Sequence, residues 1–162
     1  MKHNLLPALS VVLLMSCQTP GEQTPTNHND TGTMSTTNDE ATIKELLFAY
    51  RDALNASSVD QVMPLYTTDG VFMPTGFPTA AGTEQVRGAY AGVFSMIKLN
   101  IEFFIDEVVV DGDHAFARTT SKGTTLIHAT GETVPEENRE LFVLQRTDGG
   151  WKIARYMFNK MK

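Results

Sequence analysis

Hydrophobic residues recur at two different spacings along this chain, and the change of spacing predicts helices first and strands afterwards. Over residues 38–56 they return every three or four positions, which is typical of a helix with one buried face. The same spacing predicts another helix over residues 83–98. Between these two, Ser58 is a good cap for a short second helix, as Asn38 or Asp39 is for the first.

The rest of the chain is rich in residues that favour strands, with turn-forming residues between them. Residues 71–73 predict a short strand that ends at Pro74. Four longer strands are predicted over residues 100–110, 114–128, 138–146 and 151–160. Turns that contain glycine join members of this set as hairpins. The order of elements predicts an α+β fold, in which three helices pack on one face of a strongly curved antiparallel sheet.

The N-terminus has a basic start at Lys2, an apolar run over residues 5–15 and the small residue Ser16 before Cys17. The apolar run is too short to cross a bilayer as a helix. This arrangement resembles a bacterial lipoprotein signal, in which residues 1–16 are removed and the cysteine is lipidated on sulfur. A buried or redox-active cysteine is the weaker alternative, because the chain's only cysteine has no disulfide partner. We therefore expect an exported protein, lipid-anchored through Cys17 to the bacterial cell envelope, at the outer membrane in a Gram-negative cell.

Composition divides the remaining chain into a tether and one domain. Residues 17–38 contain almost no large apolar side chain, so they cannot bury enough surface to offset the entropy cost of ordering, and we expect a flexible tether. Residues 39–162 are long enough for a single hydrophobic core. The net charge of −6, without a cluster of basic residues, argues against nucleic-acid binding and against electrostatic docking on a membrane.

The last predicted hairpin brings together the candidate catalytic residues. With its turn at residues 147–150, the register predicts that Glu140 lies opposite Met157 and diagonally beside Arg155, with Asn159 on the same face. Glu140 would then be a general acid or base, and Arg155 and Asn159 would polarise a carbonyl or enolate oxygen. The alternative is a structural ion pair between Glu140 and Arg155 that touches no ligand. Both faces of this hairpin are apolar, so each of them needs a cover.

Three short segments stand out beside the order of helices and strands. They are LYTTDGVF at residues 65–72, GTEQV at residues 82–86 and GWKI at residues 150–153. Together with that order, they resemble the nuclear transport factor 2-like superfamily, and residues 39–162 are most similar to its SnoaL-like and ketosteroid isomerase-like bacterial domains (the SgcJ/EcaC-type group). The resemblance implies a cone with an internal pocket, and a homodimer in which a second subunit covers the remaining apolar sheet face. It implies no single reaction, because the fold carries isomerases, dehydratases, cyclases and non-enzymatic binders.

The first strand departs from the pattern of the steroid isomerases. Those enzymes carry a proton-shuttling carboxylate directly before the proline of this strand, whereas this chain has Met73 before Pro74. A thioether cannot accept a proton at neutral pH, so that mechanism does not carry over. Met73 is expected to line an apolar pocket instead. The resemblance places further lining residues near the opening of the pocket, and the predicted ligand-binding set is Tyr50, Met73, Phe77, Phe94 and Met157.

Two functions stay open at this point. The domain would bind a small apolar molecule without chemistry, which the missing carboxylate favours. Alternatively, it would be a cofactor-independent isomerase, dehydratase or cyclase that uses Glu140 for proton transfer on a small carbonyl compound. We expect no cofactor and no metal site, because the sequence has no nucleotide-binding glycine motif and no pair of histidines at ligand spacing.

Overall fold

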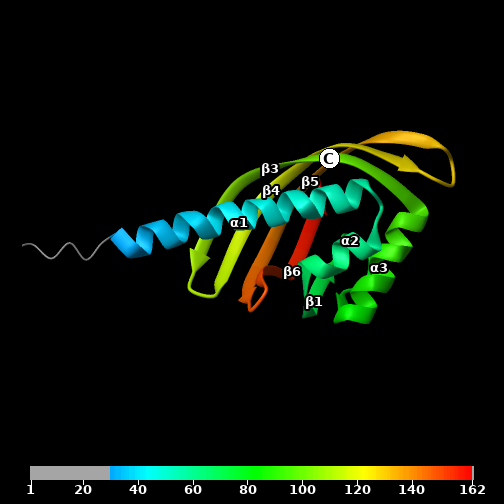
Figure 1. Ribbon diagram of the computed structural model, residues 1–162. Coiled ribbons are helices and arrows are strands. Elements are labelled where there is room, and N and C mark those ends of the chain that lie inside the picture. The colour runs from blue at the N-terminus through cyan, green and yellow to red at the C-terminus, as the bar shows by residue number, and fades with distance from the viewer. Residues whose placement is uncertain (1–29, 162) are drawn as a thin grey trace, which may run out of the picture.

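The computed structural model describes residues 30–161 of the chain, with side chains from residue 37 onward. Within them, three α-helices lie on one side of a six-stranded, strongly bent sheet (Figure 1). The predicted signal peptide, the lipidation at Cys17 and much of the tether lie outside the described residues. The helices are α1 (Asp30–Asn55), α2 (Val59–Val62) and α3 (Thr83–Met96), with a 3₁₀ turn η1 (Met63–Leu65) after α2. The strands are β1 (Tyr66–Met73), β2 (Ala80–Ala81), β3 (Ile97–Asp111), β4 (His114–Ile127), β5 (Glu132–Thr147) and β6 (Gly150–Lys160).

The sheet has the order β2-β1-β6-β5-β4-β3, and its neighbouring strands are antiparallel except β1 and β6. This arrangement confirms the predicted α+β fold, with the helices on one face of a curved and mostly antiparallel sheet. The short strand predicted over residues 71–73 is the end of the longer strand β1. The parallel neighbour of β1 is the last strand of the chain, so this pairing joins the first long strand to the C-terminal one.

Helix α1 is longer than the sequence pattern predicts. It begins at Asp30, ahead of the expected cap at Asn38 or Asp39, so the end of the predicted tether is helical. Asp39 has different partners: its carboxylate accepts hydrogen bonds from the Arg146 guanidinium at 2.6 Å and from the Trp151 indole at 3.1 Å. Asp39 is also the first buried residue of α1 among the described side chains. Among the described side chains, burial of α1 against the sheet therefore starts at Asp39, one of the two residues predicted as its cap.

The core lies between the helices and the inner face of the bent sheet, and it is built around Tyr50 of α1. The Tyr50 side chain is fully buried, and its ring centroid lies 5.3 Å from that of Tyr156 and 5.6 Å from that of Phe142. At the end of α1, the Asn55 amide donates to the backbone oxygen of Ile101 at 2.8 Å and accepts from its backbone nitrogen at 2.9 Å. Aromatic packing and this amide clamp together hold α1 across the sheet.

A β-bulge in the last hairpin changes the predicted register. Next to the turn the prediction is right, because Leu144 pairs with Ile153. The register then shifts at Ala154. Ile153 and Ala154 are both buried, which breaks the alternation of buried and exposed residues along the strand. Beyond this point Glu140 pairs with Phe158. One extra residue in a strand turns every following side chain to the other face. The part of β6 that follows the bulge therefore presents the opposite face from the predicted one.

The bulge overturns the predicted pairing of Glu140 with Arg155. Glu140 stays on the inner face, whereas Arg155, Met157 and Asn159 lie on the outer face, away from the helices. Arg155 has Asp69 as its partner, with 3.4 Å between guanidinium and carboxylate and a hydrogen bond of 3.3 Å to the Asp69 backbone oxygen. Arg155 therefore binds a carboxylate of β1, and Glu140 must find other partners.

Candidate functional site

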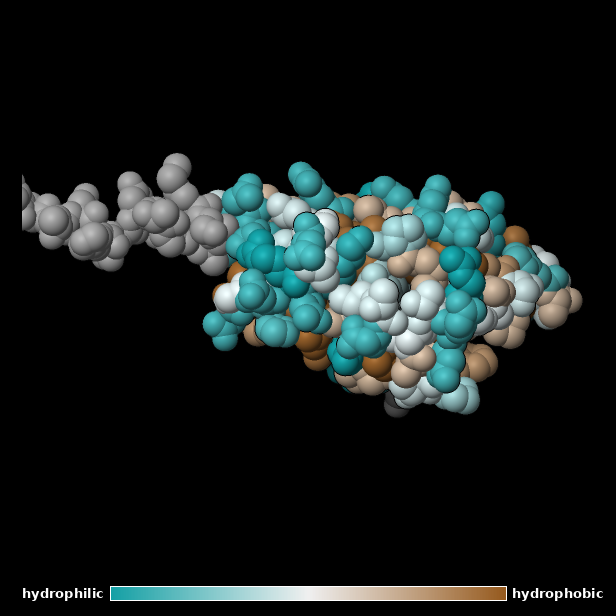
Figure 2. Space-filling view, turned by 60° about the horizontal axis from the view of Figure 1, so that its bottom comes forward, coloured by the Kyte–Doolittle hydropathy of each residue, from teal (hydrophilic) through white to brown (hydrophobic). Residues whose placement is uncertain are grey.

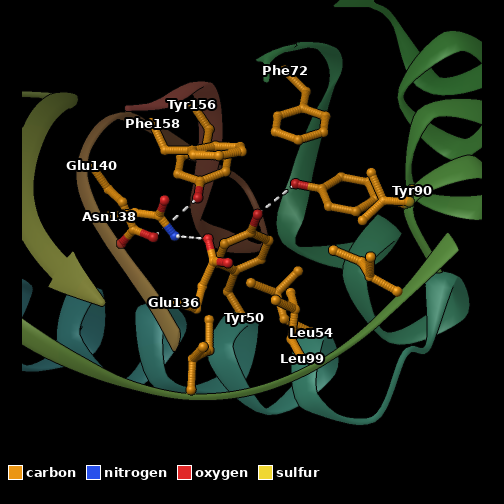
Figure 3. A pocket seen from close by; sticks show the side chains of 13 residues that line it. Tyr50, Leu54, Phe72, Tyr90, Leu99, Glu136, Asn138, Glu140, Tyr156 and Phe158 are labelled. Carbon is orange, nitrogen blue, oxygen red and sulfur yellow. Dashed lines mark hydrogen bonds between the residues drawn. The ribbon is translucent and has the colours of Figure 1, made fainter. Parts of the chain in front are cut away.

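A cavity of about 80 Å³ lies between α1, α3 and the inner face of the sheet (Figure 3). Aromatic and aliphatic side chains form most of its wall. They are Tyr50, Leu54, Phe72, Tyr90, Val93, Ile97, Leu99, Ile101, Tyr156 and Phe158. The rest of the wall comes from one strand, β5, through Glu136, Asn138 and Glu140, which we call the polar strip. Apart from the tyrosine hydroxyls, the cavity is thus an apolar space with carboxyl and amide groups along one side.

The polar strip follows from the alternation of side chains along β5. Glu136, Asn138 and Glu140 are two residues apart, so they leave the strand on the same face. Strand β4 pairs with β5 and places small hydroxyl residues opposite them, with Thr119 across from Glu140 and Ser121 across from Asn138. The two strands therefore carry a ladder of polar side chains on the inner face of the sheet.

Glu140 is a buried carboxyl, only 4% exposed, that is surrounded by hydroxyl groups. Its carboxylate accepts hydrogen bonds from Thr119 Oγ1, from Ser121 Oγ at 3.0 Å and from the Tyr156 hydroxyl at 3.3 Å. Burial raises the pKa of this carboxyl, and the three hydroxyl donors oppose that rise because they stabilise the charged form. The rise prevails, so Glu140 binds a proton more readily than an exposed glutamate does.

Asn138 bonds directly to Glu136 and is linked to Glu140 only through Ser121. Its amide nitrogen donates to Glu136 Oε1 at 3.0 Å and to Ser121 Oγ at 3.3 Å. Glu136 is held further by Thr125 Oγ1 at 2.9 Å and by the Lys160 ammonium at 3.1 Å. The Asn138 Oδ1 oxygen is buried, and no hydrogen-bond donor from the described part of the chain reaches it.

Three phenols form a second polar group, away from the polar strip. The Tyr90 hydroxyl lies 2.5 Å from that of Tyr50 and 2.7 Å from that of Tyr66, and Figure 3 shows the first of these bonds. Burial raises the pKa of all three hydroxyls well above the ordinary value, so they stay protonated. They serve the site as neutral hydrogen-bonding groups.

The structure brings only two of the predicted site residues into the cavity, Tyr50 and Glu140. Phe94 is buried in α3, with its ring centroid 5.8 Å from that of Tyr90. Arg155 and Asn159, predicted as the partners of Glu140, lie on the outer face because of the bulge.

The other predicted lining residues also lie outside the cavity. Met73 pairs with Met157 on neighbouring strands of the outer face, because Phe72 takes the inward position on β1. Phe77 is 59% exposed and lines a separate hollow between the loop after β1 and α3, together with Pro74. The predicted ligand-binding set is therefore spread over four places, namely the cavity, the core around Phe94, the outer face and this hollow.

Sequence reasoning missed Glu136 and Asn138 of the polar strip and Tyr156 of the last strand. Glu136 and Asn138 precede Glu140 at alternate positions, which is a strand signal that was visible in the sequence. Tyr156 had no such signal, because its inward orientation depends on the bulge. Tyr90 lies on the buried face of α3, as the helical spacing indicates, but its hydroxyl contact to Tyr50 joins two distant helices.

Two negative findings apply to the described residues. No group of three or more histidine, cysteine, aspartate or glutamate side chains among them is arranged to hold a metal ion. No helix among them combines the length and hydrophobicity needed to cross a bilayer.

Comparison with known proteins identifies the family of the chain. Residues 47–156 match the SnoaL-like domain, and the chain belongs to this family. A ketosteroid isomerase-like protein from Erwinia carotovora atroseptica is 35% identical, with a TM-score of 0.73 over 75% of this chain and 95% of its own. No curated protein matches the chain.

Two further solved structures share the fold. A protein from Novosphingobium aromaticivorans, proposed to be an aromatic ring hydroxylase, is 26% identical, with a TM-score of 0.68 over 78% of this chain and 91% of its own. A nuclear transport factor 2-like protein from Streptomyces avermitilis, proposed to be a dehydratase, is 20% identical, with a TM-score of 0.66 over 78% of this chain and 98% of its own. At that identity the second likeness concerns the fold alone.

Proposed function

We propose that the domain binds a small, largely apolar molecule in the cavity. The observation that carries this proposal is an aromatic and aliphatic wall that ends at the buried carboxyl of Glu140. Ligand sites in proteins commonly combine such a lining with a few polar groups that fix orientation. An engineered cavity of about 150 Å³ holds benzene, so a cavity of about 80 Å³ favours a compact ligand.

Filling the cavity tests this proposal. Leu99→Trp would place an indole in the space, and Phe48→Trp, on the exposed side of α1, is the matched control. Native mass spectrometry of the purified protein is expected to detect a bound small molecule in the wild type and in Phe48→Trp, but not in Leu99→Trp. A molecule retained by folded Leu99→Trp would contradict the cavity as its site.

Proton-transfer catalysis is the second candidate function, and the raised pKa of Glu140 beside an apolar space favours it. Glu140 would move a proton on a small carbonyl compound without a cofactor, a chemistry compatible with the ketosteroid isomerase-like description of the 35% identical protein. Arg155 and Asn159 would take no part from the outer face.

The molecule released from the protein provides the test of catalysis. Its proton exchange with D₂O, followed by NMR, is expected to be accelerated by the wild type and slowed about 10²- to 10⁴-fold in Glu140→Gln. The variant should still bind the molecule. Equal exchange rates in both proteins would exclude catalysis by Glu140 and leave the binding function.

We also propose that two copies of the chain associate through the outer face of the sheet. Large apolar side chains of β3 to β6 are exposed there, and Phe116 pairs across the strands with both Val109 and Val143. Figure 2 shows, by contrast, a face on which hydrophilic side chains predominate and hydrophobic ones appear in small patches. A broad apolar patch on a folded domain commonly marks an interface. Its members are Phe104, Val109, Phe116, Leu141, Val143 and Met157.

We propose finally that Cys17 is lipidated and anchors the exported protein to the cell envelope. The support is the sequence pattern that precedes the cysteine. In bacterial cells, Cys17→Ser is expected to move the protein out of the membrane fraction, while Ser16→Ala, which keeps a small residue before the cysteine, leaves it there. Membrane association that survives in Cys17→Ser would refute the anchor.

A further inference from the structure

The polar strip offers hydrogen-bond acceptors to the cavity while its own donors are engaged. The Asn138 amide nitrogen already donates to Glu136 and to Ser121. The other two members of the strip are carboxyls. The atoms of the strip that can still take a hydrogen bond are therefore acceptors, namely the Asn138 oxygen and the carboxyl oxygens of Glu140.

The orientation of the Asn138 amide follows from its neighbour. Glu136 forms a salt bridge with the Lys160 ammonium at 3.1 Å and accepts a hydrogen bond from Thr125 Oγ1 at 2.9 Å. An ionised carboxylate only accepts hydrogen bonds, so the amide group that faces it must be the nitrogen. Turning the amide over would set Oδ1 against the carboxylate. The oxygen is therefore held away from Glu136.

Asn138 Oδ1 is an acceptor with no protein partner. The residue is only 6% exposed, it lines the cavity, and no donor among residues 37–161 reaches its oxygen. Buried polar atoms are almost always hydrogen-bonded, and leaving one without a bond is costly. A ligand that uncovers this oxygen and brings a donor would complete its bonding, whereas a ligand without a donor would leave it unpaired.

The charged groups of the cavity also favour a ligand that donates hydrogen bonds over an anionic one. Its lining contains the carboxyls Glu136 and Glu140 but no lysine, arginine or histidine. An anionic head group would therefore meet like charges in a poorly solvated space. The phenols of Tyr50 and Tyr90 lie away from the strip and are bonded to each other, so they do not supply a donor at Asn138.

We infer that the ligand of this cavity carries an O–H or N–H donor that binds Asn138 Oδ1, and that the domain takes compact alcohols or amines in preference to ketones and carboxylates. This inference rests on the proposed binding function. A site built to pair with a donor rejects an analogue of the same shape that lacks it.

Three probes with the same three-carbon skeleton, small enough for a cavity of about 80 Å³, test the inference, namely 2-propanol, 2-propylamine and acetone. Titration of the ¹⁵N-labelled protein, followed by NMR, gives an affinity for each probe. The alcohol and the amine are expected to bind about tenfold more tightly than the ketone, which leaves Oδ1 without a donor. The signals that shift should include the Asn138 side-chain amide.

Two variants assign the preference to one atom. Asn138→Leu keeps a similar volume and removes Oδ1, so the alcohol is expected to bind no better than the ketone. Thr125→Val is the matched control, because it also removes a hydrogen bond to Glu136 but leaves the Asn138 amide in place. The preference for the alcohol is expected to persist in Thr125→Val.

The outcomes separate this inference from the proposal on which it rests. Equal affinity of the wild type for the alcohol and the ketone overturns the donor preference, whatever the variants do. A preference that survives in folded Asn138→Leu overturns the assignment to Oδ1. If none of the three probes shifts signals of cavity residues, binding in the cavity itself is refuted, and the inference falls with it.

Discussion

Glu140 is the residue in which burial and hydrogen bonding oppose each other most directly. Removal from water disfavours its charge, whereas the hydroxyls of Thr119, Ser121 and Tyr156 stabilise it. Three neutral donors offset the cost of burying the charge less than an ion pair would. No basic side chain lines the cavity to form such a pair. The carboxyl therefore keeps a raised pKa. Such a group can bind a polar atom of a ligand, and it can also exchange a proton with it.

The raised pKa has a consequence for stability. The folded pKa of Glu140 exceeds the unfolded value of 4.5, so its contribution to stability is complete below pH 4.5 and is lost as the pH rises through the folded pKa. Glu140→Gln cannot ionise. Between pH 4.5 and about pH 8, its free energy of unfolding should therefore change in favour of the variant relative to the wild type. Urea unfolding at both pH values measures this difference, and parallel changes in the two proteins would contradict the raised pKa.

At the scale of the secondary-structure elements, strands β3 and β4 come unusually close together at Gly123. The Asn55 clamp binds the backbone of Ile101, directly across from Gly123, and β3 approaches β4 closely there. A Cβ atom at Gly123 would lie 2.1 Å from the backbone oxygen of Asn100 and 2.8 Å from the Cα atom of Ile101. Only a residue without a side chain fits this approach.

Gly123→Ala is accordingly expected to lower the free energy of unfolding by about 2–4 kcal/mol, because backbone atoms must move apart. Gly88→Ala is the control within α3, where an added Cβ meets nothing within 4 Å. There the better helix propensity of alanine should raise the free energy of unfolding by about 0.5–1 kcal/mol. Urea denaturation of both variants gives the two values. A Gly123→Ala variant as stable as the wild type would show that the strands separate without cost.

The contact between α1 and the last hairpin depends on Asp39. The hydrogen bond from Arg146 is the main cause that lowers the pKa of this carboxyl, with Trp151 adding to it. Because the folded pKa lies below the unfolded value of 3.8, the stabilisation is complete above pH 3.8 and is lost as the pH falls through the folded pKa.

Asp39→Asn should therefore lower the free energy of unfolding at neutral pH by about 1–2 kcal/mol, because it removes charged hydrogen bonds. The difference from the wild type should shrink as the pH falls from 3.8 through the lower folded pKa, because the wild-type carboxyl becomes protonated over this range. Thermal or urea unfolding over this pH range is the measurement. A difference that stays constant with pH would show that packing of the side chain, and not its charge, is what matters.

At the scale of the whole molecule, the proposed dimer makes one sharp prediction. Phe116 on the outer face and Phe48 on α1 are both 38% exposed, so changing each to aspartate is a matched pair. In size-exclusion chromatography with light scattering, the wild type and Phe48→Asp should be dimers and Phe116→Asp a monomer, because a buried charge opposes association. A monomeric wild type, or a dimeric Phe116→Asp, would refute this interface.

The fold was largely predictable and the site only in part. The helical spacing from Ile43 to Leu54 and the alternation in the later strands depend on local sequence, and they led to the α+β arrangement. The cavity depends on which faces meet. Tyr50 and Glu140 line the cavity because their elements are regular up to those positions, whereas Arg155 lies outside it because a bulge precedes it.

The sequence by itself determined the order of helices and strands, the turns between them and the family to which the chain belongs, because each is written in local spacing and in short segments. Only the tertiary structure decided that Ala154 is an extra buried residue and that Tyr156, not Arg155, reaches Glu140. The physical reason is that a strand has a period of two, so one bulged residue exchanges its faces, and whether a bulge forms depends on packing against distant elements.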